Sequence, residues 1–172
     1  MNNNTKNPFL FRPVLPEETR QAIEIEMICF PPNEACTPES MAERIRAVPD
    51  LFLTAVDTRS GKLAGFLCGI ATDEESFRDA FFTDARLHDP KGKTVMLLGL
   101  DVLPAYRHCG LGHELMQEYA RREKAKGRQA LILTCKKEKA SLYREMGFHE
   151  LGLSASVWGG EQWYDMKYDL TS

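Results

Sequence analysis

The chain has 172 residues, of which 43% are hydrophobic and 27% are charged, and its net charge is −3. That length suits one domain, and the composition is typical of a folded globular protein and excludes a disordered one. There is no basic excess, so we expect no nucleic-acid partner. The longest apolar run, residues 63–71, is far shorter than the roughly 20 residues of a membrane span, so we expect no membrane partner.

The chain holds five cysteines, an odd number, and no two of them are spaced as Cys-x-x-Cys. This pattern favours neither a disulfide framework nor a zinc site, so we expect reduced thiols, a cytoplasmic location and no metal. Residues 1–9 are polar and lack the apolar core of a secretory signal. We predict that residues 1–9 are flexible and that residues 10–172 form the domain.

The first elements follow from proline and capping signals. Residues 11–15 read as a strand, and Pro16 opens a helix that runs to about Phe30. Thr37 as N-cap and Pro38 at the first helical position predict a second helix.

Two apolar strands, 51–57 and 62–71, are joined by a short link ending in glycine, which predicts a hairpin. Residues 72–93 are expected to be irregular. Residues 95–103 form the next strand, where Gly99 indicates a bulge or a close backbone approach.

The second half alternates helices and strands. Periodicity predicts helices over about 110–126 and 138–146, a buried strand over 129–135, and two strands around two glycines within 154–170. The order of elements predicts an α/β (α+β) domain with a mixed sheet.

The strongest chemical signal is a run that passes from a strand through a Gly-rich loop into a helix. It reads Leu100-Asp101-Val102-Leu103-Pro104-Ala105-Tyr106-Arg107-His108-Cys109-Gly110-Leu111-Gly112. Such a loop points backbone N–H groups at one place, and the helix dipole adds positive charge there, so the site suits a pyrophosphate. The lysine of a P-loop is absent, so this is not that motif.

The run resembles the acetyl-CoA signature of the GNAT superfamily of N-acetyltransferases, Leu-x-Val-x-Pro-x-x-Arg/Gln-x-x-Gly-x-Gly/Ala, at every fixed position. The opening around residues 11–30 looks like the arylalkylamine N-acetyltransferases, and the segment 142–148 is similar to their Phe-Tyr-x-x-x-Gly-Phe. Segments 88–90 and 159–166 look like bacterial relatives of that group. The resemblance implies a single-domain fold with a mixed central sheet of about seven strands flanked by about four helices.

The resemblance also implies acetyl-CoA as co-substrate and assigns its contacts. Strand backbone near Leu100, Asp101 and Val102 would polarise the thioester carbonyl. The pyrophosphate would be held by the backbone of the loop, with added charge from Arg107. The expected loop contacts are Arg107, His108, Cys109, Gly110, Leu111, Gly112 and His113. In the family this strand splays from the next one, and the pantetheine arm lies in the gap.

Two catalytic roles remain, a proton donor for the leaving thiolate and a base for the amine. Tyr143 matches the tyrosine given the donor role in the family. The paired histidines of the vertebrate arylalkylamine enzymes are replaced by Met96 and Leu98, so their relay is not carried over. Three candidates for the base stay open. They are Glu26, which ranks first, Asp101 and His88, with water as a further possibility.

We therefore expect an acetyl-CoA-dependent N-acetyltransferase that acts on a primary amine of a small molecule, such as an arylalkylamine. A protein N-terminal or lysine acetyltransferase and a non-catalytic CoA-binding module are the alternatives. A closed aromatic pocket would favour a small acceptor, and an open groove would favour a peptide. The loop 31–37 closes over the acceptor in the relatives. The sequence leaves open whether the protein is a monomer or a homodimer.

Overall fold

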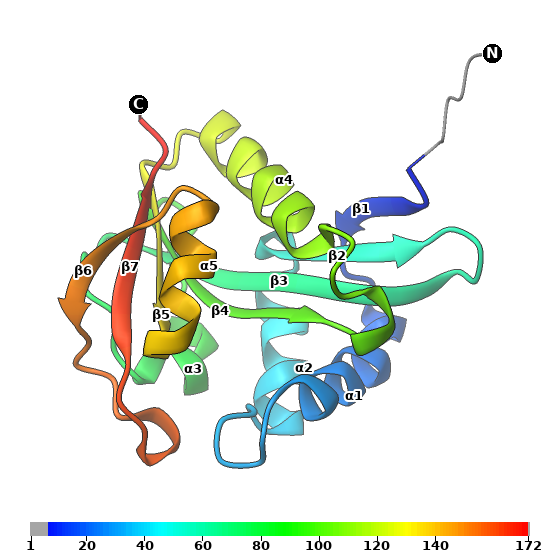
Figure 1. Ribbon diagram of the computed structural model, residues 1–172, viewed down its shortest axis with the longest axis horizontal. Helices are drawn as coiled ribbons and strands as arrows, with labels where there is room; N and C mark the ends of the chain where they lie inside the picture. The colour runs from blue at the N-terminus through cyan, green and yellow to red at the C-terminus, as the bar shows by residue number, and fades with distance from the viewer. Residues whose placement is uncertain (1–6, 172) are drawn as a thin grey trace.

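The computed structural model describes residues 7–171, which fold around one seven-stranded sheet (Figure 1). The strand order is β1-β2-β3-β4-β5-β7-β6, and only the β4–β5 pair is parallel. The predicted mixed sheet is confirmed. Most of the segment predicted to be flexible, residues 1–6, lies outside the described residues, and Phe9 already begins β1.

The bounds of the elements agree with most of the sequence-based predictions. The strands are β1 (Phe9–Pro13), β2 (Phe52–Asp57), β3 (Lys62–Thr72), β4 (Thr94–Val102), β5 (Ala130–Cys135), β6 (His149–Leu153) and β7 (Tyr164–Asp169). The helices are α1 (Thr19–Cys29), α2 (Pro38–Ala47), α3 (Ala80–Thr83), α4 (Leu111–Ala125) and α5 (Ala140–Glu145). A 3₁₀ turn at Pro16–Glu18 precedes α1. The Thr37 side chain caps α2 by accepting from the Ser40 N–H at 3.1 Å.

Helices cover both faces of the sheet. Arg44 of α2 reaches Cys68 of β3. On the next residue, a Cβ placed at Gly69 would lie 3.0 Å from the Tyr119 hydroxyl of α4. Since consecutive strand residues face opposite sides, α2 and α4 pack on opposite faces. Figure 1 shows α4 and α5 on the same side, towards the viewer.

Two sequence-based expectations are corrected at the level of elements. The segment 72–93, expected to be irregular, contains the short helix α3, so residues 7–171 hold five helices where about four were expected. The prediction of two strands within 154–170 is wrong for the first of them, because β6 ends at Leu153 and residues 154–163 form a loop. All five β6 residues are exposed, so this edge strand lacks the apolar alternation that marks a half-buried strand.

Helices long and apolar enough to cross a membrane were sought within residues 7–171, and none was found.

Candidate active site

The sheet opens between its two parallel strands. β4 pairs with β5 only from Thr94 to Met96, opposite Ala130 to Ile132, although β4 continues to Val102. On its other side β4 carries a bulge, since Cys68 lies opposite Gly99 while Gly69 lies opposite Leu97. The bulge expected at Gly99 is confirmed. It leaves the β5-facing edge of β4 without a strand partner after Met96, in the middle of the sheet.

The Gly-rich loop leads from this open edge into α4. His108 and Gly110 both adopt positive φ, +64° and +84°, and α4 begins at Leu111. The Glu114 N–H donates to the Gly110 carbonyl at 3.0 Å, whereas within the described chain the N–H groups of residues 108–113 make no such bond. These groups, with the dipole of a 15-residue helix, fit a pyrophosphate.

Two side chains of the loop bond back to the protein. The Arg107 Nε donates to the Val102 carbonyl at 3.0 Å, and the Cys109 thiol donates to the Tyr106 carbonyl at 2.8 Å. Arg107 is therefore engaged in holding the loop against the end of β4. The Val102 carbonyl also accepts from the Cys29 thiol of α1 at 3.4 Å.

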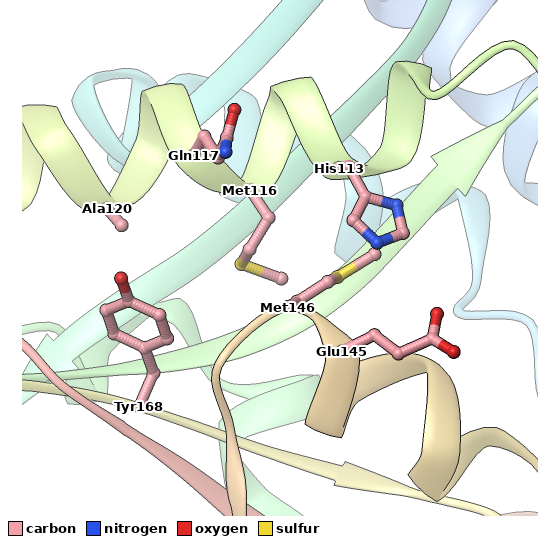
Figure 2. A pocket seen from close by; sticks show the side chains of 7 residues that line it. All are labelled: His113, Met116, Gln117, Ala120, Glu145, Met146 and Tyr168. Carbon is pink, nitrogen blue, oxygen red and sulfur yellow. The ribbon is translucent and has the colours of Figure 1, made fainter.

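A small cavity of about 60 Å³ lies between α4 and α5. Figure 2 shows the side chains that line it, which come from α4, from β7 and from the C-terminal end of α5. They are His113, Met116, Gln117, Ala120, Glu145, Met146 and Tyr168. A Cβ at Gly112 would lie 3.9 Å from both Met146 and Leu100, so the start of α4, α5 and the open edge of β4 meet at Gly112.

On the opposite face of β4, two carboxyl groups lie against Gly99. Glu26 of α1 is 5% exposed and Asp101 of β4 is fully buried. A Cβ placed at Gly99 would be 3.0 Å from Asp101 Oδ1 and 3.7 Å from Glu26 Oε1. Glu26 Oε2 accepts from the Cys36 N–H at 2.9 Å. The structure thus brings together two of the three candidate bases.

Burial and the neighbouring Glu26 raise the pKa of Asp101 well above its ordinary value, and Arg44 opposes this shift only in part. Arg44 is itself buried and donates to the Phe82 carbonyl at 2.8 Å. Burial raises the pKa of Cys36 to about 12 and also raises that of Cys68, so both thiols beside Arg44 are neutral. The burial of Arg44 could not be predicted from the sequence, because a charged residue on a helix is ordinarily exposed.

Tyr143 lies on α5, and its ring meets Phe148 edge-on at 5.8 Å between centroids. Burial raises the pKa of Tyr143, and the nearby Cys135 and Asp101 raise it further. Within the described chain its hydroxyl has no hydrogen-bond partner. The Tyr143 O–H group is therefore neutral and free to donate a hydrogen bond to a ligand. Its raised pKa makes it a weak acid.

His88 is the candidate base that the structure places elsewhere. Its Nδ1 accepts from the Ala71 N–H at 3.0 Å, and Ala71 lies opposite Val95. Val95 precedes Asp101 by six strand residues, which is about 20 Å along β4. The expectation that His88 is a candidate base is corrected, because the register of β3 and β4 carries it to the far end of the strand.

Two loops meet beside the face of the sheet that holds the carboxyl pair. Residues 30–37 join α1 to α2, and residues 154–163 join β6 to β7. The Trp158 indole N–H donates to the Glu34 carbonyl at 2.8 Å, and Asn33 Nδ2 donates to the Gly159 carbonyl at 3.1 Å.

Three further contacts hold this junction. Lys136, just after β5, forms an ion pair with Glu34 at 2.9 Å. Trp158 packs on Phe82 with 4.7 Å between ring centroids, and the Trp163 indole donates to the Trp158 carbonyl at 2.8 Å. The sequence did not point to Glu34 or Lys136, since their pairing spans 102 residues.

In residues 7–171, no cluster of three or more His, Cys, Asp or Glu side chains is arranged to hold a metal ion.

The family model "Acetyltransferase (GNAT) family" matches residues 19–148. A search of curated proteins gave no match. Among solved structures, the loading GNATL domain of CurA from Lyngbya majuscula is similar, with a TM-score of 0.81, 17% identity, and 95% of this chain and 98% of that chain covered. The GphF GNAT-like decarboxylase in complex with isobutyryl-CoA has a TM-score of 0.79 and 16% identity, with 94% and 99% covered.

A GNAT superfamily phosphinothricin acetyltransferase from Sinorhizobium meliloti, in complex with AcCoA, has a TM-score of 0.67 and 19% identity, with 95% and 89% covered. The model that matches this chain, with its splayed sheet and the loop at the start of α4, is that of a family of acetyltransferases. The chain belongs to the acetyltransferase (GNAT) family. Its single-domain GNAT fold, predicted from the sequence, is confirmed.

Proposed function

We propose that this protein transfers the acetyl group of acetyl-CoA to a primary amine of a small molecule. The observation that carries the proposal is the opening between β4 and β5, with the start of α4 and Tyr143 on one side and the carboxyl pair on the other. We infer that the amine approaches a thioester held in this opening from the face that carries α1 and α2. Transfer to a protein N-terminus or to lysine is the alternative.

Acetyl-CoA would be held largely by backbone groups. The N–H groups of residues 108–113 suit the pyrophosphate, and the unpaired edge of β4 suits the pantetheine arm and the thioester carbonyl. The proposed contacts are Leu100, Asp101 and Val102 through their backbone, and Arg107, His108, Cys109, Gly110, Leu111, Gly112 and His113 in the loop. Arg107 contributes by fixing the loop on Val102.

The chemical step needs one base and one donor. Most amines arrive as ammonium, so Glu26 takes the proton and the free amine attacks the thioester carbon. The C–N bond forms and the C–S bond breaks, leaving the acetylated amine and the CoA thiolate. Tyr143 stabilises the thiolate by a hydrogen bond until it is protonated. The raised pKa of Tyr143 makes this bond its main contribution.

The joined loops favour a small acceptor over an extended peptide. Residues 30–37 and 154–163 are linked by hydrogen bonds from Trp158 and Asn33, and Glu34 is also held by its ion pair with Lys136 just after β5. An extended peptide would need a continuous groove, which these links would cross. Trp158 and Phe82 supply aromatic surface beside the junction, as an arylalkylamine would require.

Two measurements test the proposal. Titration calorimetry should show acetyl-CoA binding, and a panel of arylalkylamines, polyamines and peptides should be screened for release of the CoA thiol. A reaction without amine reports hydrolysis of the thioester. Turnover of small amines alone supports the proposal, and turnover of peptides alone supports the alternative. Binding with no turnover on any amine would leave a non-catalytic CoA-binding module.

A further inference from the structure

Asp101 is a buried acid without a hydrogen-bond donor. It is fully buried on β4, and neither of its carboxyl oxygens has a hydrogen-bond partner. Glu26 Oε1 and Asp101 Oδ1 both lie within 4 Å of the place where a Cβ at Gly99 would stand. Two carboxylates this close in an apolar site cannot both be ionised without a large electrostatic cost. The pair therefore holds a proton.

The charges around the pair support a single negative charge. Arg44 of α2 interacts with both Asp101 and Glu26, and its single positive charge balances one negative charge. Burial raises the pKa of each thiol and phenol near the pair, so these groups are neutral. They are Cys29 of α1, Cys36, Cys68 of β3 and Tyr143 of α5.

The hydrogen bonds decide which carboxyl keeps the proton. Glu26 Oε2 accepts the Cys36 N–H at 2.9 Å, and a donated N–H stabilises the ionised form. Asp101 accepts no such bond from residues 7–171. Protonated Asp101 also satisfies its own orphaned oxygen by donating to Glu26. Ionised Glu26 beside neutral Asp101 is the arrangement in which both acids have partners.

We propose that Asp101 is a positioning residue that stays protonated and donates a hydrogen bond to Glu26, which keeps Glu26 ionised as the base for the acceptor amine. The catalytic half of this inference rests on the proposed function. During the reaction the amine proton passes to Glu26 and then to solvent, while Asp101 keeps its own proton. Nothing is oxidised or reduced.

The first test needs no substrate. Unfolding free energies of the wild type and of Asp101→Asn are measured between pH 4 and pH 8. Folded Asp101 binds its proton more tightly than unfolded Asp101. Its contribution to the stability of the wild type is therefore fully present below the unfolded pKa of about 4 and is lost as the pH rises. Asparagine cannot ionise, so we expect Asp101→Asn to gain stability relative to wild type with rising pH. A difference that is constant across this range would overturn the proposal.

The second test uses kinetics. At pH 8, Glu26→Gln should lose at least about 100-fold in kcat/KM, and the loss in Asp101→Asn should be at least about tenfold smaller than that, since the amide still donates to Glu26. Asp101→Leu removes the donor, so the acid limb of its pH profile should move to higher pH. If Asp101→Asn is as inactive as Glu26→Gln, Asp101 is the base itself and the proposal is wrong.

The two tests separate the possible failures. If no amine is acetylated but the stability difference depends on pH as expected, the protonated pair stands and the proposed function fails. If Asp101→Leu does not fold, the comparison of Asp101→Asn with Glu26→Gln still decides the role of Asp101. Binding of acetyl-CoA by each variant, measured by calorimetry, confirms that the cofactor side of the site is intact.

Discussion

At the scale of the residue, single substitutions at Tyr143 and Gly112 test the proposed chemistry most directly. Tyr143 has an uncommitted hydroxyl with a raised pKa, held by a ring contact with Phe148. Gly112 lies where α4, α5 and β4 meet, 3.9 Å from its nearest side-chain neighbours when a Cβ is added. A change at Tyr143 tests how the leaving thiolate is stabilised, and a change at Gly112 tests how closely the pyrophosphate approaches the backbone.

Tyr143→Phe removes the hydroxyl and keeps the ring. We expect kcat to fall about 10- to 100-fold while the KM for acetyl-CoA changes little, because the lost hydrogen bond acts on the charge that develops on sulfur. Steady-state kinetics measure this. The matched control is Tyr119→Phe, which removes a buried hydroxyl bonded to the Leu51 carbonyl at 2.9 Å. It should lower stability by about 1 kcal/mol and leave kcat unchanged. An unchanged kcat in Tyr143→Phe would remove its assigned role.

Gly112→Ala adds one methyl group at the start of α4. In the free protein it meets no atom closer than 3.9 Å, and alanine favours a helix over glycine by about 1 kcal/mol, so stability should be kept or raised. The Kd for acetyl-CoA should rise about tenfold or more, because the methyl group stands where the phosphate approaches the backbone. Calorimetry and thermal unfolding measure the two effects. Gly61→Ala is the control: Gly61 has φ +72° in the β2–β3 turn, so alanine there should lower the stability and leave the Kd for acetyl-CoA unchanged.

At the scale of the element, the acceptor side depends on two loops that are far apart in the sequence. Residues 30–37 and 154–163 meet through backbone carbonyls of Glu34 and Gly159, which accept from Trp158 and Asn33. Gly159 is required there, since it has φ +64° and a Cβ would lie 2.5 Å from the Asn33 carbonyl. The junction therefore holds the two loops together through side-chain hydrogen bonds and not through strand pairing.

The double variant Asn33→Ala/Trp158→Phe removes both hydrogen bonds between the loops and keeps an aromatic ring against Phe82. Two lost hydrogen bonds are worth about 2 kcal/mol at most, so we expect the KM for the amine to rise about tenfold. The KM for acetyl-CoA should stay within about twofold. Val157→Ala, at an exposed neighbouring position, is the control for the loop itself. Equal rises in both KM values would show that the junction supports the whole fold and not the acceptor site.

At the scale of the whole molecule, the sheet consists of two halves with a short seam. β1–β4 form one half and β5–β7 the other, and three residue pairs between β4 and β5 join them directly. Figure 1 shows the two sets of strands diverging from this seam. A ligand that fills the opening would contact both halves, so its binding should be coupled to the stability of the entire domain.

Acetyl-CoA should therefore raise the unfolding temperature. At a concentration 100 times its Kd, binding to the folded state alone contributes about 2.7 kcal/mol, which corresponds to about 5–10 °C for a chain of this size. Differential scanning calorimetry measures the shift, and Gly112→Ala at the same ligand concentration should show less of it. An unfolding temperature that is independent of acetyl-CoA would contradict the assigned site.

Much of the fold and part of the site followed from local signals. Thr37 and Pro38 fixed the start of α2, and Gly110 and Gly112 marked the loop before α4. The edge strand β6 was misplaced because it has no buried face, and His88 entered the candidate set because the sequence does not fix the register of β3 on β4. Resemblance to the family supplied Tyr143, whose role stays a prediction.

The sequence by itself determined the features that depend on neighbours along the chain, namely caps, turns, periodic faces and the loop that suits a pyrophosphate. Only the tertiary structure decided which groups meet across the sheet. It placed Glu26, Arg44 and Asp101 in one buried cluster, and it tied Glu34 to Lys136. The physical reason is that local signals act over a few residues, whereas burial and charge depend on everything packed within a few ångströms.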